Sequence, residues 1–140
     1  MELEEIGTLI NTQDNRITDQ PMFIIEKSVM VITDPDYGYE AEEWINTESG
    51  NYQKANVTQA RRLDALNDGC RETGDWKKFY LKEVWEFVTC CFTEQGCNEY
   101  LNANGHNIGK TRIYAHGSYR NREFQTIRNY LMMKATCKTA

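Results

Sequence analysis

The fold is decided by residues 85–133, which read WEFVTCCFTEQGCNEYLNANGHNIGKTRIYAHGSYRNREFQTIRNYLMM. This stretch opens with the end of a strand that aromatic and β-branched residues predict from Trp76 to Phe92. Between Val84 and Phe92 both faces are apolar, which predicts a central strand covered on both sides. Thr93 is placed to cap a helix that runs to about Ala103. That helix can turn three residues inward, namely Cys97, Tyr100 and Leu101.

The same stretch continues with a second strand and a second helix. Asn104-Gly105 predicts a left-handed end for the first helix, because glycine adopts positive φ at no steric cost. Thr111 to Ala115 predicts a short strand. Ser118 or Asn121 can cap the final helix, whose expected buried stripe is Phe124, Ile127, Leu131 and Tyr130.

The residues before this stretch predict simpler elements. They are a helix over 3–10, a strand or tight hairpin over 22–32, a turn over 34–38, an edge strand near 40–45, a polar turn at Ser49-Gly50-Asn51, a helix over 57–70 capped by Asn56, and a strand over 76–92.

These elements predict an α+β fold. Its central, mainly antiparallel sheet combines the strands near 22–32, 76–92 and 111–115, and about three helices near 57–70, 94–103 and 122–133 pack on it. A chain of 140 residues has room for one substantial core. We therefore expect a single domain over 1–140 that ends in a β-α-β-α unit.

Charge is distributed unevenly along the chain. The net charge is −5, but residues 93–140 hold seven Lys/Arg and three acids, whereas residues 1–92 hold nine Lys/Arg and eighteen acids. A locally positive surface on an acidic protein can attract an anionic ligand while binding to bulk DNA is disfavoured. The alternative is that the two halves neutralise each other in the fold.

Composition also bounds the compartment. No apolar run reaches the roughly 18 residues that span a bilayer, and the N-terminus lacks the pattern of a signal peptide. The five cysteines have no Cys-x-x-Cys spacing, which favours reduced, mostly buried thiols over disulfides or zinc. We expect a soluble, cytoplasmic protein with no cofactor and no metal, and the aromatic content makes a homo-oligomer plausible.

Polar residues with binding chemistry gather in the loops and short strand of the C-terminal unit. Arginine grips phosphate or carboxylate with a forked guanidinium, tyrosine can stack on a base, and histidine both donates and accepts hydrogen bonds near neutral pH. Helix N-termini add free backbone N–H groups. The candidate ligand-binding residues are His106, Asn107, Arg112, His116, Tyr119, Arg120 and Arg122.

Each of these residues also has a purely structural interpretation. Arg120 or Arg122 can pair with Glu123 or with an acid of the N-terminal half. His106 and Asn107 can satisfy the backbone groups of a turn. Both interpretations remain open at the level of sequence.

Enzyme mechanisms fit the sequence less well than binding does. A two-histidine phosphoesterase needs two His-x-Thr/Ser elements; His116-Gly117-Ser118 supplies one, but His106-Asn107-Ile108 does not supply the other. A Cys–His nucleophile would draw on Cys90, Cys91 or Cys97, which fall on apolar segments where a thiol is inert. We therefore expect no catalysis.

Three segments carry a resemblance: Thr12-Gln13-Asp14-Asn15-Arg16-Ile17-Thr18 followed by Pro21-Met22-Phe23; Phe92-Thr93-Glu94 with Gly96-Cys97, Tyr100-Leu101 and Asn104-Gly105-His106-Asn107; and Arg112-Ile113-Tyr114 followed by Tyr119-Arg120-Asn121. Over about residues 10–131 they resemble a family of small accessory proteins encoded by phages and prophages. The resemblance brings no established catalytic or binding residues. It implies a role in countering host defence, by blocking an effector complex or sequestering a nucleotide signal.

The sequence thus predicts a counter-defence protein, anti-CRISPR-like or nucleotide-sequestering. It would bind a host defence complex or a nucleotide-like anion through the C-terminal loops, in the cytoplasm of the host cell. Two alternatives remain. One is a nucleotide-processing phosphoesterase or transferase that uses His106 or His116. The other is a virion accessory protein or an acidic mimic of nucleic acid that depends on Asp34, Asp36, Glu40, Glu42 and Glu43.

Overall fold

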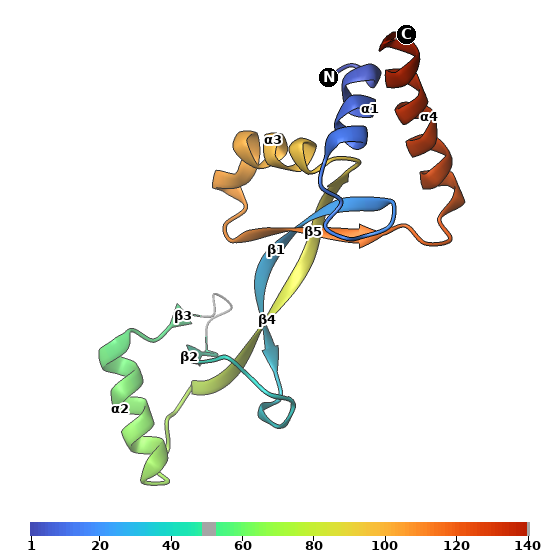
Figure 1. The fold of residues 1–140 in the computed structure, drawn as a ribbon. Helices are drawn as coiled ribbons and strands as arrows, with labels where there is room; N and C mark the ends of the chain where they lie inside the picture. Colours follow the sequence, from blue (N-terminus) through green and yellow to red (C-terminus); the bar gives the residue numbers. More distant parts are fainter. Residues whose placement is uncertain (49–52, 140) are drawn as a thin grey trace. The chain divides into compact units, whose positions relative to one another are not determined.

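The structure is a computed structural model that describes residues 1–48 and 53–139, with side chains described as far as Ala135 (Figure 1). The turn expected at Ser49-Gly50-Asn51 lies outside the described residues. The elements are α1 (Leu3–Thr12), β1 (Pro21–Thr33), the 3-10 turn η1 (Pro35–Tyr37), β2 (Ala41–Asn46), β3 (Gln53–Lys54), α2 (Val57–Asp68), β4 (Trp76–Cys91), α3 (Glu94–Asn104), the 3-10 turn η2 (Gly105–Asn107), β5 (Thr111–Gly117) and α4 (Arg122–Thr139).

The strands form one five-stranded sheet in the order β3-β2-β4-β1-β5. The pairs β1–β5, β2–β3 and β2–β4 are antiparallel. The predicted α+β class, the antiparallel sheet and the order strand, helix, strand, helix after residue 76 are therefore confirmed. The helix expected over 3–10 is present as α1.

The sequence predicts one domain over 1–140, and the contacts of the structure group into two compact units. Unit 1 comprises Met1–Ser28 and Trp85–Ala140, and unit 2 comprises Val29–Val84. The division falls inside β1 and inside β4, so both strands contribute to both units.

The core of unit 1 lies between α3 and one face of the sheet. Phe23 and Ile25 of β1 and Cys97 of α3 are fully buried. Successive strand residues point to opposite faces, so the buried residues of β1 share one face. Tyr100 and Leu101 of α3 pack on the same cluster, as predicted, together with Val88, Cys91, Ile113 and Ala115.

The helices α1 and α4 of unit 1 lie side by side (Figure 1). Gly7 of α1 is buried against α4, and a Cβ atom added at Gly7 would overlap the carbonyl oxygen of Leu131 and lie 3.0 Å from Cβ of Ala135. The absence of a side chain at this position therefore permits the close approach of the two helices.

Unit 2 is built around β2, which pairs with β3 and β4 and contacts α2. Leu63 of α2 is fully buried, and Trp44 of β2 donates from Nε1 to Asp64 at 2.9 Å. The predicted cap of α2 is confirmed, because the side chain of Asn56 accepts from the backbone N–H of Gln59 at 2.8 Å and the Gln59 side chain accepts in return.

Two predictions about helix surfaces and ends are wrong. Gly105 has helical angles, φ −58° and ψ −30°, and the chain continues into η2; the positive φ falls instead on Gly109, at 85°. On α4, Ile127 and Tyr130 are exposed, while Arg128 and Ala135 are buried with Phe124 and Leu131. The stripe shifts because α4 packs along α1 through Leu131 and Ala135, which share a face at i, i+4 spacing.

The prediction that the segment 84–92 is covered on both faces is also wrong. β4 occupies the centre of the strand order, yet Phe87 is 59% exposed and Cys90 is exposed. A mainly apolar run, interrupted only by Glu86 and Thr89, therefore indicates a central strand here but not a second covering layer.

Gly7→Ala is expected to destabilise the protein by about 1–3 kcal/mol, because the added methyl group must push α4 away from α1. The measurement is thermal unfolding followed by circular dichroism at the helix band.

Gly105→Ala is the matched control. Gly105 has helical angles, and an added Cβ would find its nearest contact at 3.9 Å, on Leu101. We expect this variant to match the wild type or to gain roughly 0.4–1 kcal/mol. Equal melting temperatures for the two variants would contradict the close packing at Gly7.

Candidate functional site

Three of the predicted site residues alternate along β5. Arg112, Tyr114 and His116 are all exposed, whereas Thr111, Ile113 and Ala115 between them are partly buried. The alternation follows from the two-residue period of a strand, since Ile113 and Ala115 face the core under α3. The structure therefore brings these three side chains together on one face of the sheet.

The same face carries apolar side chains from the neighbouring strand. Residues opposite each other in an antiparallel pair point to the same side, and β1 places Met22 opposite His116 and Ile24 opposite Tyr114. Both residues are only half-buried. The rings of Tyr114 and His116 lie 6.2 Å apart, and Tyr114 is 49% exposed.

Arg112 links this face to β4. Its guanidinium carbon lies 4.2 Å from the centre of the Trp85 ring, and Nζ of Lys110 lies 5.5 Å from the same ring. Nε of Arg112 also donates to Glu26 at 2.9 Å, which is its cross-strand partner. This ion pair uses one of five guanidinium N–H donors, so Nη1 and Nη2 still carry donors.

We call this surface the open face and define it by the residues just described together with Phe87, which is two residues along β4 from Trp85 and therefore points to the same side. It comprises Met22, Ile24, Glu26, Trp85, Phe87, Lys110, Arg112, Tyr114 and His116. The sequence pattern did not predict Trp85 and Phe87 as site residues, because it placed both in a covered core. The charged residue Glu86 between them would, by alternation, also place Trp85 and Phe87 on a buried face, so no local signal indicates their exposure.

The loop after β5 and the first residue of α4 hold three more predicted residues. Tyr119 and Arg120 are exposed and lie against each other, with the guanidinium carbon 5.2 Å from the ring centre. Asn121 caps α4, since its side chain accepts from the backbone N–H of Phe124 at 3.1 Å, and Arg122 is the first residue of the helix. Of the two predicted caps, Asn121 is confirmed and Ser118 is not; Oγ of Ser118 donates instead to the carbonyl of Gln20 at 2.6 Å.

His106 and Asn107 are not part of this group. Both are exposed in η2, which precedes β5, whereas Tyr119 and Arg120 follow it (Figure 1). A strand rises about 3.4 Å per residue, so the two ends of β5 are roughly 20 Å apart. One small ligand cannot contact both ends, and the seven predicted residues do not form a single pocket.

This separation also bears on catalysis. His106 and His116 lie at opposite ends of β5, so they cannot flank one phosphate as a histidine pair. Among the described residues no group of three or more His, Cys, Asp or Glu is arranged to hold a metal ion. The residues on the open face suit stacking and anion binding rather than acid–base chemistry on a shared atom.

The cysteines differ in exposure. Cys97 is fully buried, and Cys91 is half-buried. Desolvation raises the pKa of Cys91 and raises the pKa of Cys97 to about 12, so neither thiol forms a nucleophilic thiolate near neutral pH. Cys70 and Cys90 are exposed, so the expectation of mostly buried thiols is wrong for them.

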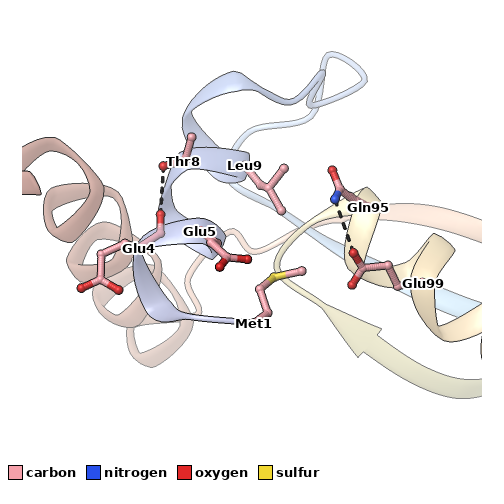
Figure 2. Close-up of a pocket in the computed structure, with 7 residues that line it drawn as sticks. All are labelled: Met1, Glu4, Glu5, Thr8, Leu9, Gln95 and Glu99. Carbon is pink, nitrogen blue, oxygen red and sulfur yellow. Dashed lines mark hydrogen bonds between the residues drawn. The ribbon is translucent and has the colours of Figure 1, made fainter. Parts of the chain in front are cut away.

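One pocket of unit 1 lies away from these residues. A pocket of about 410 Å³ between α1 and α3 is lined by Met1, Glu4, Glu5, Thr8, Leu9, Gln95 and Glu99 (Figure 2). It contains none of the predicted site residues. Three carboxylates border it, so it disfavours the anionic ligand that the sequence predicts.

In unit 2 two of the acids considered for mimicry are paired with lysines. Lys78 lies 2.8 Å from Glu42, and Lys54 lies 3.1 Å from Glu43. The hydrogen bond from Lys78 lowers the pKa of Glu42, and the contact with Glu42 raises the pKa of Lys78. Neutralised carboxylates are poor stand-ins for a row of phosphates.

Comparison with known proteins gives no assignment: no family model, no curated protein and no solved structure matches the chain. Within the part of the chain that the structure describes, no helix is long and apolar enough to span a membrane. The open face and the loop after β5 therefore have to be judged by their own chemistry.

Thiol labelling is expected to follow burial. With N-ethylmaleimide at mildly alkaline pH, Cys70 and Cys90 should react first and Cys97 last. A pKa near 12 leaves about a thousandfold less thiolate than the ordinary thiol value of 9.0. Peptide mapping by mass spectrometry measures the order. Labelling in urea is the control and should remove the difference; equal rates at Cys90 and Cys97 in the native protein would contradict the packing of α3.

Proposed function

We propose that the protein is a phage-encoded counter-defence protein that binds a nucleotide-like or single-stranded nucleic-acid component of a host defence system through the open face and the loop after β5. The observation that carries the proposal is the exposed row Arg112, Tyr114 and His116 next to Trp85 and Phe87. The phage and counter-defence context rests on the sequence resemblance alone.

Exposed aromatic side chains on a sheet suit base stacking. Nucleobases bind single-stranded sites by lying on aromatic rings, and this contact tolerates many sequences because every base has a π-face. Tyr114 and Phe87 are large, exposed and supported from the buried side by the core under α3. Neither a buried core nor an ordinary solvent-exposed strand requires exposed aromatic rings at these two positions.

Cations lie beside these rings. Lys110 and Arg112 contact Trp85, and Arg120 lies against Tyr119 at the end of the same strand. Arginine next to an aromatic ring can bind a phosphate while a base stacks on the ring. β5 and the loop that follows it thus offer groups that can bind both the base and the phosphate of a nucleotide.

The length of the surface favours an extended ligand. His116, Tyr119 and Arg120 lie near one end of β5 and Lys110 lies near the other, roughly 20 Å away. A mononucleotide can use only part of this row, whereas an oligonucleotide of several residues can use all of it. We therefore expect oligonucleotides to bind more tightly than mononucleotides.

Tyr114→Ala is expected to weaken binding of a fluorescein-labelled single-stranded RNA by about five- to 150-fold, from ~1–3 kcal/mol per stacked base. Fluorescence anisotropy measures the dissociation constant. Tyr130→Ala on α4 is the matched control, since Tyr130 is 54% exposed and Tyr114 is 49% exposed. If the wild type binds neither RNA nor single-stranded DNA, or if both variants bind like the wild type, the proposed surface is wrong.

The double variant Arg120→Ala/Arg122→Ala tests the loop. We expect weaker binding and a shallower salt dependence, with the log–log slope reduced by about 0.7 per lost phosphate contact. Thermal stability should stay within about 1 kcal/mol, because exposed charged side chains contribute little to it. Arg61→Ala/Arg62→Ala on α2 is the control, since both of these arginines are exposed and lie in unit 2.

The counter-defence role has a separate test. In a bacterial host whose CRISPR or nucleotide-signalling defence blocks a phage, expression of the wild type should restore plaques, and Tyr114→Ala should not. Nucleic-acid binding without any restoration, in hosts that carry either class of defence, would count against the counter-defence role while leaving the binding surface intact.

A further inference from the structure

The second half of β1 has a free backbone edge. β5 pairs with β1 only over Pro21–Lys27, and the backbone N–H of Ser28 donates to the carbonyl of Lys110 at 2.9 Å. Beyond Ser28 no described strand lies on that side of β1, because β4 pairs with its other side. Residues 29–33 therefore form an edge strand.

This edge is apolar and exposed. Met30 is 45% exposed, Val31 37% and Ile32 62%. Consecutive residues of a strand point to opposite faces, so apolar groups are exposed on both faces at once. Such an edge is a ready template for another strand, and natural proteins usually protect it with charge, proline or a covering element. Here the nearest charged residues, Lys27 and Asp34, lie outside the segment.

The direction of the backbone groups follows from Ser28. In an antiparallel sheet the N–H and C=O of one residue point to the same side, and the side alternates along the strand. Ser28 points toward β5, so Met30 and Ile32 point in the same direction, past the end of β5. Their N–H and C=O groups face the free edge.

We propose that a second copy of this chain pairs with this edge, antiparallel and two-fold symmetric, with Val31 opposite Val31 of the partner and Met30 opposite Ile32. In this register Met30 of each copy exchanges both backbone hydrogen bonds with Ile32 of the other. All outward backbone groups of the segment are then satisfied, and its apolar side chains cover one another across the two strands.

The register centred on Met30 is disfavoured because it overlaps the end of β5. With Met30 opposite Met30, Ile32 would face Ser28, whose N–H already donates to Lys110. That part of β1 is already paired with β5, so a second copy in this register would have to displace Lys110. The register centred on Val31 keeps the pairing within residues 29–33 and avoids this conflict.

Self-pairing limits the proposed assembly to two copies. A two-fold interface uses the same edge on both copies and closes on itself. On the outer edge of β5 a side chain occupies one backbone acceptor, since Nη1 of Arg16 donates to the carbonyl of Ile113 at 3.0 Å. The proposed dimer does not depend on the nucleic-acid surface, which is assigned to other residues.

Light scattering coupled to size exclusion tests the proposal on the full chain. The wild type should elute at twice the protomer mass of 16.4 kDa. The Val31→Lys variant should have the mass of a single protomer, because the substitution places two like charges opposite each other at the centre of the interface. Val57→Lys is the matched control: Val57 is 70% exposed at the start of α2, and the variant should remain dimeric.

Hydrogen–deuterium exchange locates the interface without any variant. In the wild type, the amides of Met30 and Ile32 should become more protected as protein concentration rises, while those of the exposed loops should not change. A wild type that is monomeric at every concentration overturns the proposal. A dimer that persists in folded Val31→Lys, or concentration-dependent protection confined to another segment, overturns it as well.

Discussion

The contact of Phe23 and Ile25 with Cys97 determines the rest of unit 1. Because strand side chains alternate between faces, burying these residues under α3 turns every other residue of β1 and β5 away from the core. Arg112, Tyr114 and His116 are exposed for this reason and not through any preference of their own. The hydrophobic pattern of β1 therefore positions the candidate site, although β1 contributes only apolar side chains and Glu26 to it.

Most elements were predictable because their signals are local. Asn56 and Thr93 cap α2 and α3 as the sequence predicts, since a cap depends only on a side chain and the next backbone N–H groups. The residues that were predicted wrongly depend on distant partners. Ile127 is exposed and Arg128 is buried because α1, more than a hundred residues earlier, decides which side of α4 is covered. The period of a helix predicts which residues share a face, but it does not predict which face a neighbouring helix covers.

The candidate site was predictable in chemistry but not in arrangement. Arg112 and His116 have the expected exposure, yet the sequence could not show that β5 separates His106 from Tyr119. The charges, too, were predictable in kind but not in arrangement. The pair Glu26–Arg112 joins an acid of the acidic half to a base of the basic half, whereas Arg16–Glu94 joins the minority charges of the two halves. Glu42 and Glu43 are neutralised by lysines within unit 2. The overall charge imbalance therefore says little about any one surface.

The way the two units divide the chain has a consequence for synthesis on the ribosome. Unit 2 is continuous, from Val29 to Val84, whereas unit 1 needs both its first residues and its last. Val29–Val84 can gather its own contacts while the C-terminal part is still being translated. Phe23 and Gly7 must wait for α3 and α4, so the apolar residues of β1 stay without a core throughout elongation. Pairing at such sequence separation is slow, and the apolar residues among the N-terminal 28 stay open to association with other chains until residues 85–140 have been made.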